Sequence, residues 1–346
     1  MERAKRIFIT VIICLIAIEL LLRLSGVFKT SSEKSGMGYV SSYGEVHPTW
    51  YNTHKPYDTL IPPTTDFHYQ FCTNKLGLRD KDYPTNKSDS VYRILITGNS
   101  YVEGVGAPYD STWPRLLEKE LLSRNMRVEV IDAGISSNDI MYDYVFYRDK
   151  LRSYHPDLVI GTMNNSDYIY YAFRGGMERF HKDGTVHYLP IPRYDFLSHY
   201  SHLFRAILAI YQPLEGAYLS KSNYRAVANR ATADFARVIK TYNDTVTKDG
   251  AKFILMVYPK KNDIGLSSFF IRNSSNNFSA LSKLLSNDGI ANFNIIAPMK
   301  NKLESQKKEN FTYQHDGHFK PSGYLILAKL ACDSLIASQI IQPGRQ

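Results

Sequence analysis

The chain has 346 residues, of which 44% are hydrophobic and 13% aromatic; this composition is typical of a globular protein and excludes a disordered one. The net charge is +9, but the lysines and arginines are scattered without a dense run, so no nucleic-acid partner is expected. An anionic membrane surface or an acidic glycan suits such a charge better.

The N-terminal segment predicts a single-pass membrane anchor over residues 1–28. The run Ile7–Leu22 is nearly all apolar, interrupted only by Thr10 and Glu19, and extended to Phe28 it is just long enough to cross a bilayer as a helix. Three basic residues precede it: Arg3, Lys5 and Arg6. Because positive residues favour the cytoplasmic side, the rest of the chain is expected on the extracytoplasmic side.

A cleaved signal peptide is the alternative interpretation of this segment. The stretch LLLRLSGVF offers no convincing small-residue cleavage site, which favours an uncleaved anchor. Glu19 and Arg23 stand four residues apart, so they are expected to pair on one face of the helix near its outer end.

Residues 29–65 are rich in Ser, Gly, Tyr and Pro without clear periodicity and are interpreted as a linker. Beyond them, short apolar runs alternate with amphipathic stretches. The expected strands are 91–97, 127–132, 157–163, 251–258 and 293–296. The expected helices are 112–124, 139–152, 224–248, 278–285 and 322–337. This alternation predicts an α/β domain over 66–340, in which a central parallel sheet is covered by helices on both faces.

Two features lie outside this alternation. Residues 168–223 are aromatic and turn-rich, which indicates an insertion that faces the substrate or the membrane surface. Among the three cysteines, Cys14 lies in the apolar segment, whereas Cys72 and Cys332 either pair in an oxidising compartment or remain free thiols.

Ser100 is the first candidate for catalysis. It follows the expected strand 91–97 in the sequence ILITGNSYVEGVG and precedes a helix, so it stands at the carboxyl edge of the sheet, where active sites of such folds lie. A serine at this place is also common as an ordinary helix cap. The G-x-S-x-G, G-x-G-x-x-G and phosphate-loop patterns all fail here, which disfavours those three kinds of site.

A serine nucleophile needs a base, and the C-terminal sequence YQHDGHFKPSGY supplies a candidate. His318 could take the proton from Ser100, while Asp316 in the same loop could orient the imidazole. The alternative is a polar loop that merely starts the last helix with Pro321 and Ser322.

Histidine pairs make metal binding a further alternative. His315 and His318 are spaced H-x-x-H, and so are His199 and His202. Neither pair has the glutamate of H-E-x-x-H or an obvious third ligand, and there is no C-x-x-C, so no zinc site is expected.

The ends of two further strands carry candidate donors for a developing oxyanion. Gly134 follows the strand 127–132, where a backbone N–H can be approached without a Cβ in the way. Asn164 and Asn165 follow the strand 157–163, and the strand length favours Asn165 as the inward-pointing amide. Any such loop could contain each of these residues, but together they share one sheet edge with Ser100.

Taken in order, these blocks resemble the SGNH hydrolases, also called GDSL esterases. ILITGNSYVEGVG is similar to the serine block, VEVIDAGISS to the glycine block, PDLVIGTMNNSDY to the asparagine block and HDGHFKPSGY to the histidine block. The stretches TNKLGLRDKDY and AKFILMVYPKK look like a membrane-anchored bacterial branch. The resemblance spans residues 66–338 apart from the insertion.

This resemblance implies a flavodoxin-like three-layer α/β/α fold and ester chemistry without a cofactor. Ser100 would be the nucleophile, His318 the base and Asp316 its orienting partner. The implied oxyanion hole consists of the N–H groups of Ser100 and Gly134 and the side chain of Asn165, with Asn164 as the alternative.

The chain departs from the family pattern at three places. Asn99 stands where the family usually has aspartate, Asn164-Asn165 replaces a plain Asn-Asp, and Asp316 precedes His318 by two positions instead of three.

The expected function is a serine esterase or O-acyltransferase acting on ester-linked, for example acetyl, groups of an extracytoplasmic glycan or lipid. The alternative is a catalytically inactive glycan-binding or envelope-assembly protein with the same fold.

Overall fold

The computed structural model describes residues 2–25, 45–46, 52–61, 64, 66–180, 200–211, 221–264, 269–305, 311–313 and 316–342. By their contacts the residues divide into two compact units. One comprises Met1–Ser42 with Leu189–Ala226, and the other comprises Tyr43–Tyr188 with Val227–Gln346.

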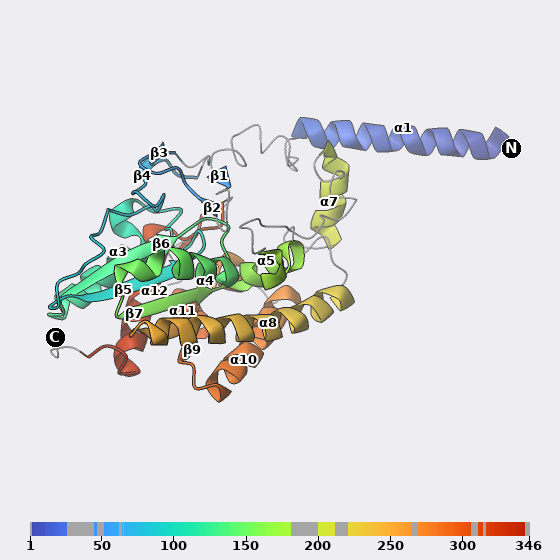
Figure 1. The fold of residues 1–346 in the computed structure, drawn as a ribbon. Coiled ribbons are helices and arrows are strands. Elements are labelled where there is room, and N and C mark those ends of the chain that lie inside the picture. Colours follow the sequence, from blue (N-terminus) through green and yellow to red (C-terminus); the bar gives the residue numbers. More distant parts are fainter. Residues whose placement is uncertain are drawn as a thin grey trace. The chain divides into compact units, whose positions relative to one another are not determined.

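A five-stranded parallel sheet forms the centre of the larger unit (Figure 1). Its strands are β5 (Tyr92–Gly98), β6 (Val128–Gly134), β7 (Leu158–Met163), β8 (Lys252–Val257) and β9 (Asn292–Asn294), in the order β6-β5-β7-β8-β9. The apolar runs of β5 to β8 form these strands because both faces of the sheet are buried. The order is that of flavodoxin-like sheets, whose ligand crevice opens between the first and third strands, here β5 and β7.

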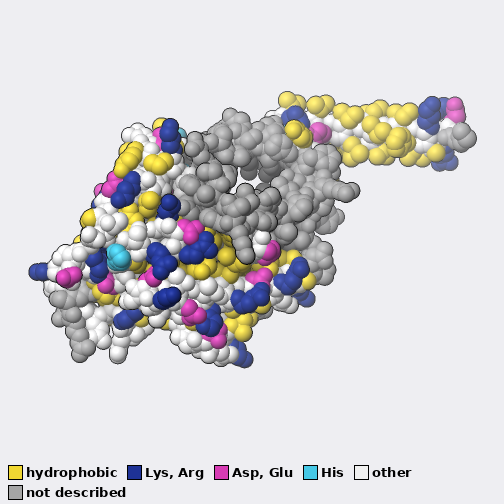
Figure 2. Space-filling model, viewed as in Figure 1, with side chains coloured by type: hydrophobic (Ala, Val, Ile, Leu, Met, Phe, Trp, Pro, Cys, Tyr) yellow, Lys and Arg dark blue, Asp and Glu magenta, His cyan; other side chains and the backbone are white. Residues whose placement is uncertain are grey.

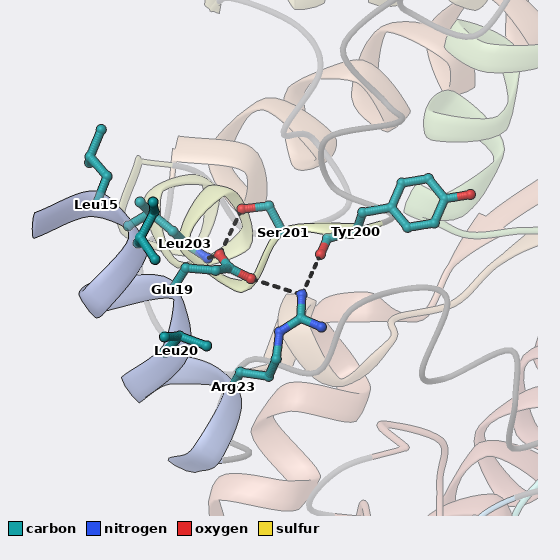
Figure 3. Close-up of a pocket in the computed structure, with 8 residues that line it drawn as sticks. Leu15, Glu19, Leu20, Arg23, Tyr200, Ser201 and Leu203 are labelled. Carbon is teal, nitrogen blue, oxygen red and sulfur yellow. Dashed lines mark hydrogen bonds and ion pairs between the residues drawn. The ribbon is translucent and has the colours of Figure 1, made fainter. Parts of the chain in front are cut away.

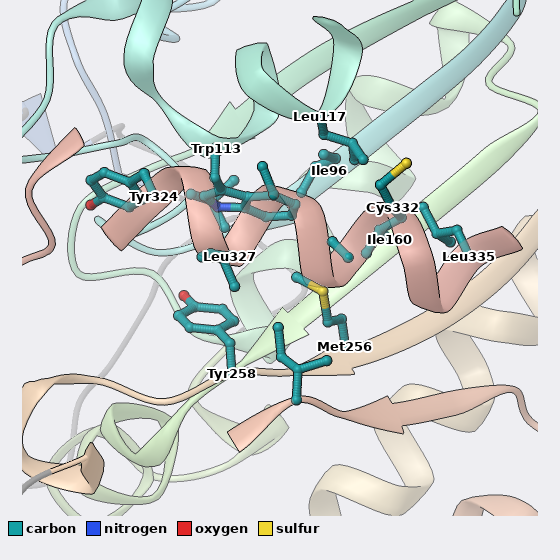
Figure 4. Close-up of a cluster of buried hydrophobic side chains, with 14 of the residues drawn as sticks. Ile96, Trp113, Leu117, Ile160, Met256, Tyr258, Tyr324, Leu327, Cys332 and Leu335 are labelled. Atoms are coloured by element: carbon teal, nitrogen blue, oxygen red, sulfur yellow. The ribbon is translucent and has the colours of Figure 1, made fainter. Parts of the chain in front are cut away.

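Helices cover both faces of the sheet (Figure 1). One face carries α3 (Trp113–Ser123), α11 (Ile296–Ser305) and α12 (Pro321–Ala337), which pack with the strands in one buried apolar cluster (Figure 4). On the other face, α4 (Ile140–Asp149) contacts β5 and β7, and α8 (Lys221–Lys248) places Tyr242 against Phe253 of β8 with ring centroids 4.8 Å apart. The predicted three-layer α/β/α sandwich is confirmed.

Shorter or peripheral elements complete the described part of the larger unit. The remaining helices there are α5 (Asn165–Arg174), α9 (Lys261–Ile264) and α10 (Phe269–Asn287). Short 3₁₀ turns span Tyr109–Ser111, Leu151–Tyr154 and Met177–Arg179. Two antiparallel pairs are formed by β1 (Glu45–Val46) with β2 (Asn52–Thr53) and by β3 (Thr59–Leu60) with β4 (Phe71–Cys72).

Several element boundaries differ from the sequence-based expectation. The strand expected to end at 296 ends at Asn294, because the Asn294 side chain accepts a hydrogen bond of 2.9 Å from Ile296 N and so begins α11. The helix expected over 278–285 runs from Phe269 to Asn287.

Cys72 and Cys332 are free thiols, the first exposed and the second buried in the core, so these two cysteines do not pair.

The smaller unit contains α1 (Glu2–Ser25) and α7 (His202–Tyr211). Helix α1 is exposed along its described length, its surface is covered with hydrophobic side chains (Figure 2), and it is long and apolar enough to span a membrane. The expected pair of Glu19 and Arg23 is formed, with 3.1 Å between carboxylate and guanidinium.

The Glu19 carboxylate also contacts the first turn of α7 (Figure 3). It accepts hydrogen bonds from Ser201 Oγ at 2.9 Å, His202 N at 3.0 Å and Leu203 N at 2.8 Å, while Arg23 donates to Tyr200 O at 3.0 Å. The first N–H groups of a helix have no partner inside the helix, so a carboxylate there both satisfies them and complements the helix dipole.

Candidate active site

Ser100 lies in a tight turn directly after β5. The carbonyl of Asn99 accepts hydrogen bonds from Val102 N at 2.9 Å and Glu103 N at 3.1 Å, so the chain reverses at once at the carboxyl end of the strand. Gly106 closes this loop with φ +97°, and a Cβ there would lie 2.6 Å from Phe319 O. The loop that carries Ser100 therefore lies against the loop that carries His318.

The structure brings the three expected catalytic side chains together. His318 Nε2 is 2.8 Å from Ser100 Oγ, and His318 Nδ1 is hydrogen-bonded to Asp316 Oδ1. With the proton assigned to Nδ1, which donates to the carboxylate, Nε2 is free to accept the proton of the serine hydroxyl. This arrangement can activate a hydroxyl for attack on a carbonyl carbon.

Contacts from two other segments hold the histidine loop, which is the stretch 316–318 with Asp316 and His318. Asp316 N donates to Asp66 Oδ2 at 2.7 Å. Tyr101 donates from its hydroxyl to Gly317 O at 3.2 Å, and its ring lies 4.7 Å from the ring of His318. The residue next to the serine thus supports both the backbone and the ring of the histidine loop.

Asp316 is an ionised partner of His318. Burial would raise the pKa of this carboxyl group, but the hydrogen bond and charge of His318 outweigh burial and hold the pKa below its usual value. The carboxylate can therefore keep the imidazole in one tautomer and stabilise the imidazolium that forms when the serine gives up its proton.

The depressed pKa predicts a pH-dependent contribution to stability. Because the pKa of Asp316 is lower in the folded state, this carboxylate stabilises the fold above about pH 4 and ceases to do so as the pH falls through the folded pKa. In urea unfolding, Asp316→Asn is expected to be less stable than wild type at pH 7, with the gap closing near pH 3. Asp89→Asn, at an exposed turn, is the control; an equal gap for Asp316→Asn at both pH values would contradict the assignment.

Gly134 ends β6 and pairs with Gly98 of β5. A Cβ on Gly134 would lie 2.1 Å from Glu103 N and 2.6 Å from the carbonyl carbon of Val102, so only glycine fits where the two loops touch. Its N–H donates to Asp132 Oδ1 at 3.0 Å. A substrate oxyanion would therefore compete with Asp132 for this donor.

The two candidate asparagines occupy different positions at the start of α5. Asn164 is the buried N-cap: its Oδ1 accepts from Ser166 N at 2.8 Å, and its Nδ2 lies 3.5 Å from Asn99 Oδ1. Asn165, preferred from the sequence, is the first residue of the helix, and its buried Oδ1 has no hydrogen-bond partner among the described residues. Asn164 is thus the amide that the structure places beside the serine block.

Asn99, next to Ser100 in the sequence, serves as a hydrogen-bond acceptor. Its Oδ1 accepts from the buried Tyr258 hydroxyl at 2.8 Å and from Tyr101 N at 3.1 Å. An aspartate oxygen could accept from the same donors, so an amide and a carboxylate can make the same contacts at this position.

We expect Asn99→Asp to keep kcat within about tenfold of wild type, because the donors around the side chain suit either residue. Asn99→Ala removes the hydrogen bond from the buried Tyr258 hydroxyl and is expected to cost about 1–3 kcal/mol of unfolding free energy. Ester hydrolysis and urea unfolding of both variants check this. A loss of kcat by about 10³-fold in Asn99→Asp would show that the amide itself is required.

Three buried charged residues next to the site were not anticipated as part of it. They are His54, Arg79 and Glu103. Arg79 belongs to the stretch TNKLGLRDKDY and Glu103 to ILITGNSYVEGVG. A charged residue inside each of these motifs is the sequence feature that could have identified the two residues.

The metal alternative receives no support from the described residues. They contain no group of three or more His, Cys, Asp or Glu side chains placed to share an ion. His199 and His315 lie outside the described residues, and His202 belongs to the smaller unit. His318 is engaged by Ser100 and Asp316.

Comparison with known proteins gives structural likenesses only. No family model matches the sequence, and no curated protein matches it. Among solved structures, an acetyl xylan esterase is 15% identical with a TM-score of 0.45 over 70% of this chain and 100% of its own. A lipase/acylhydrolase from Enterococcus faecalis is 12% identical with a TM-score of 0.45 over 74% of this chain and 100% of its own. A putative lipolytic protein of the G-D-S-L family from Desulfitobacterium hafniense is 13% identical with a TM-score of 0.42 over 70% of this chain and 98% of its own.

Proposed function

We propose that this chain is a serine esterase or O-acyltransferase in which Ser100 is the nucleophile. The observation that carries the proposal is the continuous contact from Ser100 Oγ through His318 to Asp316 at the carboxyl edge of the sheet. A purely binding or assembly protein would not need this arrangement, because it supports proton transfer and not recognition.

In the first half of the reaction, Ser100 Oγ bonds to the acyl carbon while His318 Nε2 takes the hydroxyl proton. The carbonyl electron pair moves to the oxygen, which becomes an oxyanion. When this pair returns, the ester C–O bond breaks, and the leaving alkoxide takes the proton from Nε2. The products are a free hydroxyl group and an acyl-serine enzyme.

In the second half, water or a second hydroxyl group attacks the acyl-serine, with His318 again as the base. Water gives hydrolysis, and a sugar or lipid hydroxyl gives transfer. The proposed oxyanion donors are the N–H of Ser100, the N–H of Gly134 and the Nδ2 of Asn164. Donors fixed before the reaction stabilise the charge as it develops, which is the main contribution of such a site.

The proposed substrate is a small acyl group, such as acetyl, esterified to an extracytoplasmic glycan or lipid. The apolar helix α1 supports a membrane location, and the net charge of +9 supports attraction to an anionic envelope surface. The proposed topology is single-pass, with the α/β unit on the extracytoplasmic side.

Reaction with a fluorophosphonate probe tests the nucleophile directly. The wild-type protein is expected to be labelled at Ser100, with labelling lost in Ser100→Ala and blocked by prior reaction with an ester inhibitor. Labelling of a different residue, or labelling that persists in Ser100→Ala, would refute the proposal. Identification of the modified peptide by mass spectrometry distinguishes these outcomes.

A further inference from the structure

Glu103 is a fully buried carboxylate three residues after Ser100. Its Oε2 accepts hydrogen bonds from both the backbone N (2.5 Å) and the hydroxyl of Ser136, and its Oε1 is 2.8 Å from His54 Nε2. Ser136 stands two residues after Gly134. One side chain therefore joins the loop after β5 to the loop after β6, which are the two loops that carry the proposed backbone oxyanion donors.

The same two loops also touch through their main chains at this residue. Glu103 N donates to Asn99 O at 3.1 Å, and it is the atom that a Cβ on Gly134 would meet at 2.1 Å. The Glu103 side chain reaches the second loop two residues further along. The distance between the loops is thus determined by packing at Gly134 and by hydrogen bonds at Ser136.

Arg79 binds the later part of the serine loop, which is the stretch 99–107 after β5. Its guanidinium donates to Glu103 O at 3.1 Å, Gly104 O at 2.8 Å and Ala107 O at 2.6 Å, and it lies 4.7 Å from the ring of Tyr69. The planar guanidinium presents its N–H donors in a fixed fork, so it holds these three carbonyl groups in one arrangement.

The burial of a charge here calls for a reason beyond stability. Burial would raise the pKa of Glu103, but His54 and the Ser136 hydroxyl outweigh it and hold the pKa below its usual value. Burial would likewise lower the pKa of His54, yet the Glu103 carboxylate raises it. A buried ion pair adds little net stability compared with apolar residues, and in this pair the carboxylate also joins His54 to Ser136.

We propose that Glu103 is a positioning residue that sets the spacing between the Ser100 and Gly134 N–H donors. The inference rests on the proposed function, because it concerns the same oxyanion hole. Donors that are misplaced by about 1 Å can cost about 10²-fold in rate even when the substrate still binds. Glu103 therefore acts on kcat and not on KM.

Three substitutions separate this role from a general loss of folding. Glu103→Asp keeps the charge but is one methylene shorter, so it cannot reach both Ser136 and His54. Glu103→Gln keeps the length of the side chain. Its oxygen can therefore still accept from Ser136, and its NH2 group can donate to a neutral His54. The matched control is Glu129→Asp, which shortens a carboxylate paired with Arg93 near the amino ends of β5 and β6, at the opposite edge of the sheet.

For Glu103→Asp we expect kcat for ester hydrolysis to fall by about 10²-fold with KM within about threefold of wild type. The rate constant for fluorophosphonate labelling of Ser100 is expected to fall in parallel. Glu103→Gln is expected to restore kcat to within about tenfold of wild type, and Glu129→Asp to leave both quantities unchanged. Thermal unfolding confirms that each variant is folded.

A folded Glu103→Asp variant that is labelled at the wild-type rate would overturn the inference, and so would a rise in KM without a loss of kcat. If Glu103→Asp does not fold, Ser136→Ala replaces it: this variant removes one donor to Oε2, and unchanged kcat would again overturn the inference. A wild-type protein that is not labelled at Ser100 would refute the proposed function itself, which is a different result.

Discussion

Replacement of Ser100 by alanine is expected to lower kcat for ester hydrolysis by about 10⁴- to 10⁶-fold, with little change in stability. The reason is that Ser100 Oγ is the proposed nucleophile, while its side chain is only partly buried and its loop is held by backbone contacts. Initial rates with p-nitrophenyl acetate measure the effect. Ser90→Ala, at an exposed turn before β5, is the matched control and should retain the wild-type rate.

The same contact predicts that the effects of serine and histidine substitutions do not add. His318→Ala removes the proposed base, whose Nε2 lies 2.8 Å from Ser100 Oγ, so the double variant is expected to be no slower than Ser100→Ala within about threefold. A double variant slower by the product of the two single effects would show that the two residues contribute independently of each other.

Gly134→Ala is expected to lower the unfolding free energy by about 3 kcal/mol or more, because the added methyl group has no space. The atoms it would meet are backbone atoms of Glu103 and Val102, which can move only if the serine loop moves. The expected loss of kcat accompanies the loss of stability, since both proposed backbone donors are displaced.

Gly250→Ala provides the control for this substitution. Gly250 has φ +84°, but no atom lies within 4 Å of the place that a Cβ would take, so an alanine there meets backbone strain without a clash. Its cost is expected to be about 1 kcal/mol, with no change in kcat. Urea unfolding compares the two variants, and a Gly134→Ala variant as stable as Gly250→Ala would contradict the close contact between the loops.

Much of the fold could be predicted from the sequence because its strands are short apolar runs. The runs 91–97 and 157–163 became β5 and β7 within one residue at each end, since buried parallel strands leave little room for polar residues. The Ser100, His318 and Asp316 contact followed from the same pattern, because the carboxyl ends of parallel strands and the loops near them share one edge.

The remaining features depend on contacts between distant segments, which spacing does not encode. Nothing in the sequence indicates that Glu103 meets Ser136 and His54, or that Arg79 reaches three carbonyl groups 24 to 28 positions away. The choice between Asn164 and Asn165 depended on where α5 begins, and helix boundaries are set by capping contacts that a strand-length argument does not include.

The contact of Glu19 with the first turn of α7 affects how a water-soluble form of this protein should be designed. A chain shortened to begin after Ser25 would lack the carboxylate that accepts from Ser201, His202 and Leu203. The N–H groups of that turn would then need water, next to an apolar helix whose neighbour had been removed. Residues 2–25 and 200–211 are therefore best retained together or deleted together.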